Sequence, residues 1–154
     1  MRSPADSVEE IWNKWADDML RYATVLVGPD RADDVVDDVV VTLLERLTNE
    51  PDRRFERGYV LTMVLNTARM LHRSQGRRER REWKVAELPY HAELLADPSV
   101  LIAVGRLSVM QRAVIYLTYW EDLTPGAVAE QMGVSVGSVK RHLARGRARL
   151  RKVL

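Results

Sequence analysis

Residues 123–150 read LTPGAVAEQMGVSVGSVKRHLARGRARL, and this stretch determines more about the fold than any other part of the chain. Thr124 and Pro125 are typical of a helix start, because threonine suits the N-cap and proline loses nothing at the first helical position. The pattern predicts a short helix from there to Met132.

Three small or apolar residues in this stretch have the spacing of a helix-turn-helix. Ala129 suits a close crossing of two helices, Gly133 permits a left-handed turn, and Val139 packs the second helix onto the first. The second helix is expected from Ser135 to about Val153. The alternative, an isolated solvated helix, does not account for this spacing.

The second helix of the motif is strongly basic and contains no acidic residue. In this fold the start of that helix enters the DNA major groove. Lys140 and Arg141 are the best candidates for hydrogen bonds to guanine, and Arg145 is better placed for the phosphate backbone. The predicted DNA-binding residues are Ser135, Val136, Ser138, Lys140, Arg141 and Arg145.

Charge is distributed unevenly along the 154 residues. Residues 1–52 carry five basic and 13 acidic side chains, whereas residues 53–154 carry 19 basic and nine acidic ones. The asymmetry favours nucleic acid as the partner of the basic part and a basic protein surface as the partner of the acidic part.

Several classes of protein are excluded by what the sequence lacks. It has no cysteine and only three scattered histidines, so we expect no disulfide and no metal site, and no cofactor motif occurs. We find no nucleophile with a histidine partner and expect no enzymatic activity. No apolar run approaches the roughly 20 residues that span a bilayer, which predicts a cytoplasmic protein without membrane insertion.

The remainder of the chain is also predicted to be helical. Apolar stripes of period 3.6 indicate helices from about Ser7 to Val27, from Arg31 to Leu47 and from Tyr59 onward. The valines of the second segment also allow a strand, but its aspartates occur in pairs, which favours a helix. Val40, Leu44 and Tyr59 are expected to face inward, as are Trp12, Trp15 and Trp120. Ser108 and Gln111 form a capping box for another helix.

Three segments resemble the extracytoplasmic-function sigma factors of RNA polymerase. LSVMQRAVIYLTYWEDLTPGAVAEQMGVSVGSVKRHLARGRARLRK, from Leu107, is similar to region 4, which reads the minus-35 element. RADDVVDDVVVTLLERL (31–47) resembles region 2.2, and YVLTMVLNTARMLHRSQGRR (59–78) resembles regions 2.3 and 2.4, which open and read the minus-10 element. The resemblance implies an all-α protein of two small helical domains: a region 2 bundle (1–79), a linker (80–99) and a region 4 helix-turn-helix (100–154).

The resemblance also implies roles for residues outside the helix-turn-helix. Asp34, Asp37 and Asp38 match the face that docks on the polymerase clamp, although alone they would be read as a solvated helix face. The loop 49–58 corresponds to one that holds a flipped base, where Phe55 either stacks or anchors the loop in the core. The minus-10 candidates are Phe55, Asn66, Arg69, Arg73, Arg77 and Arg78.

The chain departs from the family pattern at several positions. Ser108 replaces a usual proline, Val40 replaces an aromatic residue, and Met70 to His72 replace an expected aspartate. With Arg141 and His142 on the recognition helix, these departures leave the sequence of both promoter elements unspecified. The role of Trp83 is open.

The predicted function is that of a sigma factor, which binds core RNA polymerase through its clamp and flap and directs promoter-specific initiation. The resemblance further implies an anti-sigma factor as a partner. One alternative is a free-standing, dimeric helix-turn-helix regulator, which leaves residues 1–78 unexplained. Another is a sigma-like regulator of phage or plasmid origin that acts as an activator or repressor.

Overall fold

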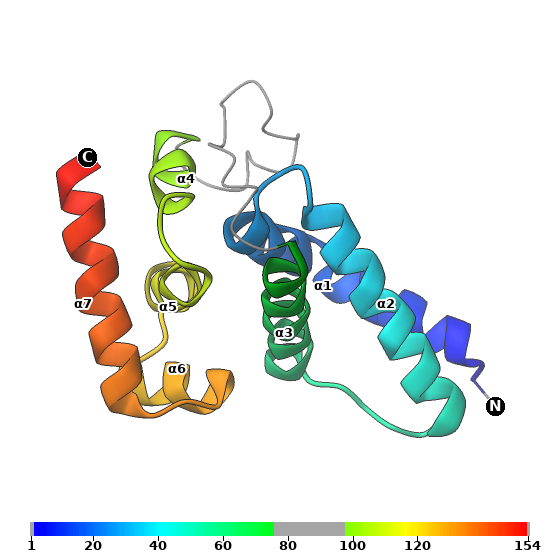
Figure 1. The fold of residues 1–154 in the computed structure, drawn as a ribbon. Coiled ribbons are helices and arrows are strands. Elements are labelled where there is room, and N and C mark those ends of the chain that lie inside the picture. The colour runs from blue at the N-terminus through cyan, green and yellow to red at the C-terminus, as the bar shows by residue number, and fades with distance from the viewer. Residues whose placement is uncertain (1, 76–97, 154) are drawn as a thin grey trace.

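The computed structural model describes residues 2–75 and 98–153, and these ranges contain seven α-helices and no strand (Figure 1). The predicted all-α class is therefore confirmed. Arg77, Arg78, Trp83 and most of the predicted linker lie outside the described residues. The helices are α1 (Pro4–Val27), α2 (Ala32–Asn49), α3 (Arg57–Gln75), α4 (Pro98–Val104), α5 (Val109–Tyr119), α6 (Pro125–Met132) and α7 (Val136–Val153).

Helix α1 begins three residues earlier than predicted because its N-cap is Ser3. The Ser3 hydroxyl accepts a hydrogen bond from the Asp6 amide, and the Asp6 side chain accepts one from the Ser3 amide. This capping box satisfies two of the free donors at the helix start. The helix ends at Gly28, whose φ of 90° allows the turn into α2.

Helix α2 buries one stripe of its valines and leucines against α1 and α3. Val35, Val36, Val39, Leu43 and Leu47 are buried, while the aspartates of its first two turns face solvent. This arrangement confirms the helix over the alternative of a strand, because in a strand successive side chains would point to opposite faces.

Three residues expected in the core are more than one third exposed. The exposed fractions are 38% for Trp12, 41% for Leu44 and 40% for Tyr59. Each follows or precedes a buried residue, and a rotation of about 100° per residue moves it to the margin of the apolar stripe. By contrast, Val40, Trp15 and Trp120 are half-buried and pack against the core.

Helices α5, α6 and α7 form the predicted helix-turn-helix and its support. Thr124 caps α6 by accepting from the Ala127 amide, and Gly133 is left-handed with a φ of 68°. Ala129 and Val139 are buried where the helices cross. The capping box of Ser108 and Gln111 starts α5 as expected.

Helix α7 approaches α5 closely at Gly146. A Cβ atom added to Gly146 would lie 3.2 Å from Cγ1 of Ile115, closer than most side-chain contacts. The absence of a side chain therefore allows the backbone of α7 to pack directly on α5, and this contact sets the distance between the two helices.

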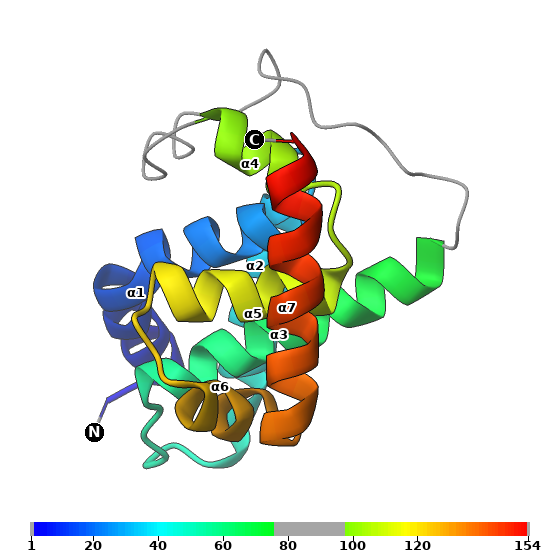
Figure 2. The same ribbon diagram turned by 90° about the vertical axis from the view of Figure 1, so that its left-hand side faces the viewer.

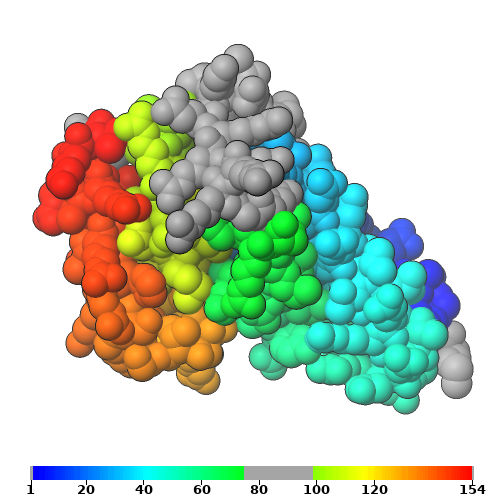
Figure 3. All heavy atoms as spheres, viewed as in Figure 1, coloured from blue at the N-terminus to red at the C-terminus, as the bar shows by residue number. Residues whose placement is uncertain are grey.

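The amino-terminal bundle and the helix-turn-helix half pack against each other. Helix α1 contacts α5, and α3 contacts both α5 and α6, so that one apolar core runs through both halves. Figures 1 and 3 show α4–α7 on one side of the body and α1–α3 on the other. We call this interface, in which α1 and α3 contact α5 and α6, the seam. At its centre Tyr22 of α1 stacks on Tyr116 of α5, with ring centroids 4.8 Å apart.

Replacement of Gly133 by alanine should lower the free energy of unfolding by about 1–2 kcal/mol, because an L side chain is strained at that φ. Gly126→Ala is the matched control: Gly126 lies within α6 with open space around it, so alanine there should be neutral or stabilise by up to about 1 kcal/mol. Urea denaturation measures both. Equal effects of the two variants would contradict the left-handed turn.

Candidate nucleic-acid interface

The first turns of α7 present the predicted minus-35 residues on the outer surface of the molecule. Lys140, Arg141 and Arg145 are exposed and have no hydrogen-bond or ion-pair partner among the described residues. Figure 2 shows α7 running along the face nearest the viewer. These three cations are therefore free to meet phosphates or base edges.

The residues that open α7 have different roles from one another. Ser135 lies just before the helix, and its hydroxyl accepts a 3.1 Å hydrogen bond from the Ser138 amide, so it caps the helix. Val136 is exposed and Ser138 is half-buried. Val136 thus presents an exposed apolar side chain at the start of α7, and the Ser138 amide is already engaged by the cap.

The later arginines of α7 are partly held by the protein itself. Arg147 donates from Nε to the Tyr119 hydroxyl at 2.6 Å, and Arg149 donates to the carbonyl oxygen of Arg106 at 3.4 Å. This distinguishes them from Arg145, which is free. The sequence pattern alone could not separate these arginines, because their spacing and type are the same.

His142 points partly inward between two exposed arginines. Burial of the imidazole, together with the positive charges of Arg141 and Arg145, lowers the pKa of His142 below its ordinary value. The side chain is therefore neutral at pH 7, and it adds no charge to the basic face of α7 in the free protein.

Asn66, Arg69 and Arg73 share one face of α3, as their spacing of three and four residues requires. Asn66 and Arg73 are exposed and Arg69 is half-buried. Phe55 is not beside them: Asn66 lies seven residues beyond Tyr59, about 10 Å along the helix axis. The predicted minus-10 residues therefore form two groups, one on α3 and one at the loop that precedes it.

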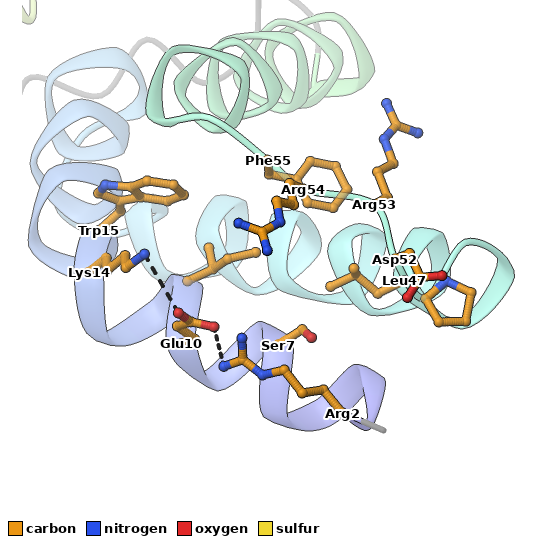
Figure 4. A pocket seen from close by; sticks show the side chains of 12 residues that line it. Arg2, Ser7, Glu10, Lys14, Trp15, Leu47, Asp52, Arg53, Arg54 and Phe55 are labelled. Atoms are coloured by element: carbon orange, nitrogen blue, oxygen red, sulfur yellow. Dashed lines mark ion pairs between the residues drawn. The ribbon is translucent and has the colours of Figure 1, made fainter.

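The loop before α3 borders a pocket of about 360 Å³ between α1, the end of α2 and residues 51–55 (Figure 4). Trp15 of α1 and Phe55 of the loop contribute aromatic rings to its wall. Glu10 forms ion pairs with Arg2 and with Lys14, the latter at 3.6 Å, at the edge of the pocket. The lining residues are Arg2, Ser7, Glu10, Ile11, Lys14, Trp15, Leu47, Pro51, Asp52, Arg53, Arg54 and Phe55.

Beside this pocket an aromatic pair is flanked by arginines, a feature that the sequence analysis missed. The rings of Phe55 and Tyr59 lie 5.5 Å apart, and the guanidinium of Arg53 lies 5.0 Å from the first ring and 5.4 Å from the second. Arg46 of α2 lies 5.6 Å from the Tyr59 ring. We call Arg46, Arg53, Phe55 and Tyr59 the aromatic–arginine cluster. Helical spacing could not have revealed it, because Phe55 precedes α3, which begins at Arg57.

The predicted clamp-docking face of α2 contains more than its aspartates. Asp34, Asp37 and Asp38 are exposed as expected, and two apolar side chains follow them toward the carboxyl end of the helix. These are Val41, 53% exposed, and Leu44, 41% exposed. Their exposure, which the periodicity did not predict for Leu44, makes this face both acidic and apolar.

Comparison with known proteins identifies the family. Residues 100–150 match the family model described as Sigma-70, region 4. The chain is 31% identical over 150 residues to the RNA polymerase sigma-E factor of Streptomyces coelicolor, an alignment that covers 95% of this chain and 85% of that protein. The chain belongs to the sigma-E type RNA polymerase sigma factors. The same identity extends over 153 residues of the sigma-E factor of Streptomyces avermitilis, covering 95% and 84% of the two chains.

A solved structure shares the fold of this sigma factor. It is the sigma factor RpoE of Bartonella quintana in complex with the anti-sigma factor NepR, with a TM-score of 0.72 and 20% sequence identity over 94% of each chain. Sigma factors of this family are not enzymes. In the described parts of the chain no group of acidic or histidine side chains could hold a metal ion, and no helix could cross a bilayer.

Removal of the Tyr59 ring should weaken binding of single-stranded DNA to this sigma factor bound to core polymerase. Stacking of a base on an aromatic side chain contributes about 1–3 kcal/mol, so Tyr59→Ala should lower the affinity by about tenfold. Tyr59→Phe keeps the ring and should remain within about twofold. Fluorescence anisotropy with a labelled oligonucleotide tests this, and wild-type affinity in Tyr59→Ala would show that the ring does not contact DNA.

Proposed function

We propose that this sigma factor docks on core RNA polymerase through α2, reads the minus-10 element with α3 and the loop before it, and reads the minus-35 element with α7. The observation that carries the proposal is the separation of charge between surfaces. Helix α2 exposes acidic side chains, whereas the first turns of α7 expose unpaired cations. One surface suits a basic protein and the other suits DNA.

Docking on the clamp combines electrostatic steering with apolar burial. The exposed aspartates of α2 favour approach to a basic surface, and the adjacent Val41 and Leu44 provide area that can be removed from water. Apolar residues at the centre of an interface contribute more to affinity than charges at its rim. This face therefore has the composition of a specific protein-binding site.

Reading of the minus-10 element divides between the two groups of residues near α3. The pocket beside Phe55 has room, aromatic walls and arginines, and these suit a base that has left the duplex together with its phosphate. The energy cost of flipping is a few kcal/mol, and stacking with hydrogen bonds can offset it. Asn66, Arg69 and Arg73 would contact the strand farther along α3.

The partners of this protein are proposed from its relatives. The structural neighbour is bound to an anti-sigma factor, and we propose that an anti-sigma factor also controls this chain. A sigma factor works where RNA polymerase works, so we place the protein in the cytoplasm. A free-standing dimeric regulator is disfavoured, because the acidic and apolar face exposed by residues 31–47 would then have no binding partner.

Run-off transcription with core polymerase from a related bacterium tests the proposed function. Addition of this protein to a pool of genomic promoter fragments should produce discrete start sites that share two spaced motifs. Co-purification with core polymerase without any new start site would instead support a sigma-like regulator. Tight sequence-specific binding of duplex DNA by the isolated protein would favour the free-standing regulator.

Truncation of the apolar part of the clamp-docking face should weaken binding to core polymerase. The double variant Val41→Ala/Leu44→Ala should lower the affinity by about tenfold, because each CH2 group removed from a buried interface costs about 0.8 kcal/mol and these side chains would be partly buried. Val153→Ala, a change at another exposed valine, is the control and should have no effect. Surface plasmon resonance with immobilised core enzyme measures both. Equal affinities would remove this face from the interface.

Variants of α7 should separate base contacts from phosphate contacts. Lys140→Ala should reduce discrimination between promoter sequences by about 1–3 kcal/mol, whereas Arg145→Ala should weaken all sequences alike and reduce the salt slope of binding by about one. Arg147→Ala should have a smaller effect, because Tyr119 already holds that side chain. Titrations of holoenzyme on promoter DNA at several salt concentrations provide these values. Loss of sequence preference in Arg145→Ala would reverse the two roles.

A further inference from the structure

One guanidinium joins the two halves of the molecule. Arg57, the first residue of α3, donates from Nε to Oδ2 of Asp18 at 2.9 Å and from Nη2 to Oε1 of Glu121 at 2.7 Å. Asp18 belongs to α1, and Glu121 lies between α5 and α6 with only 12% of its side chain exposed. We call this three-residue contact the Arg57 bridge.

The charges of the Arg57 bridge are mutually stabilised. The hydrogen bond to Glu121 outweighs burial and raises the pKa of Arg57. Burial disfavours the Asp18 carboxylate, but hydrogen bonds and positive charge from Arg57 and Arg21 outweigh it, so the pKa of Asp18 lies below its ordinary value. Arg57 and Asp18 are therefore charged at neutral pH.

Other polar contacts cross the same seam. Arg112 of α5 donates to the carbonyl oxygen of Leu26 at the end of α1, at 2.6 Å. The Thr62 hydroxyl of α3 shares its proton between the carbonyl oxygens of Gln131 in α6, at 3.0 Å, and Gly58 in its own helix, at 2.9 Å. These bonds align the two halves in one orientation, which apolar contacts alone would not specify.

The seam also contains a destabilising feature, because it buries two polar groups that form no hydrogen bond within the described part of the chain. The hydroxyl groups of Tyr22 and Tyr116 are buried with no hydrogen-bond partner among the described residues, and burial raises the pKa of both phenols. An unpaired buried polar group costs about 1–3 kcal/mol. Separation of the halves would hydrate both hydroxyls, so the closed arrangement is less favourable than its apolar area suggests.

The closed body is too small to read both promoter elements. A compact chain of this length has a radius of gyration of about 15 Å and hence a diameter of about 40 Å. Elements centred near positions minus 10 and minus 35 are about 25 base pairs apart, or about 85 Å of duplex at 3.4 Å per step. The helix-turn-helix half must leave the amino-terminal bundle before α3 and α7 can reach their elements.

We propose that the seam is an autoinhibitory contact within the chain, and that the Arg57 bridge is the latch that keeps the free sigma factor closed. The inference rests on the proposed function, since it is the reading of two elements that requires opening. Because only the open fraction is competent, the latch lowers the apparent affinity for promoter DNA by that fraction. The latch does not require an anti-sigma factor.

A thiol placed under the seam reports how often the halves separate. The chain contains no cysteine, so Thr62→Cys introduces one thiol, which lies against α6 and is partly covered in the closed state. Its rate of modification by a thiol reagent rises with the open fraction even when that fraction is small. A thiol at the exposed Asn13 gives the rate without protection.

Glu121→Gln in this background should raise the modification rate by about fivefold, within the usual range of coupling between two states. Glu130→Gln is the matched control: it removes the same charge from an exposed position of α6 whose side chain forms no ion pair or hydrogen bond with the described residues. Equal rates in the two variants would overturn the latch. A wild-type rate equal to that of the Asn13 thiol would overturn the closed state itself.

A reversible crosslink tests the consequence for transcription. Cysteines at Thr62 and Gln131, joined by a reducible bis-methanethiosulfonate reagent, should abolish promoter-specific run-off products, and a reductant should restore them. Full activity of the crosslinked protein would contradict autoinhibition. Absence of run-off products before crosslinking and after reduction would instead be a failure of the proposed function, and the thiol rates would still decide the latch.

Discussion

The packing of α1 against α5, centred on the stacked rings of Tyr22 and Tyr116, is the contact on which the rest of the structure depends. It joins helices α1–α3 and α4–α7 into one body with a continuous apolar interior. Small domains bury a low fraction of their surface and gain stability from such a partner. The seam also determines which faces of α2, α3 and α7 remain available to other molecules.

The exposed surfaces of α7 and of the loop before α3 are held in place by different interactions. On α7 the helix backbone supports the free cations, and the cap at Ser135 together with the crossing at Val139 sets its direction. Beside Phe55 the support comes from side chains, since Arg46 and Arg53 hold the Tyr59 ring in place. The position of the cations on α7 therefore depends on packing of the core, whereas the position of the rings beside the loop depends on contacts near the surface.

Local signals in the sequence predicted the helices well, because a cap, a left-handed glycine and an apolar stripe each act within a few residues. The helix-turn-helix of residues 124–153 appears as expected for this reason. The prediction of burial was wrong for residues at the margin of an apolar stripe, such as Leu44 and Tyr59. Periodicity does not show how much of such a side chain is covered by neighbouring helices. The Arg57 bridge was not foreseen at all, since its three residues lie far apart along the chain.

The contact between Gly146 and Ile115 has a consequence for the orientation of α7. With no side chain at position 146, the backbone of α7 lies directly against Ile115, and the Cβ atom of Gln111 is the next neighbour at 3.8 Å. A bulkier residue at either position would push α7 outward and turn its cationic face relative to the bundle. The direction of the cationic face of α7 is thus coupled to the size of one buried aliphatic side chain.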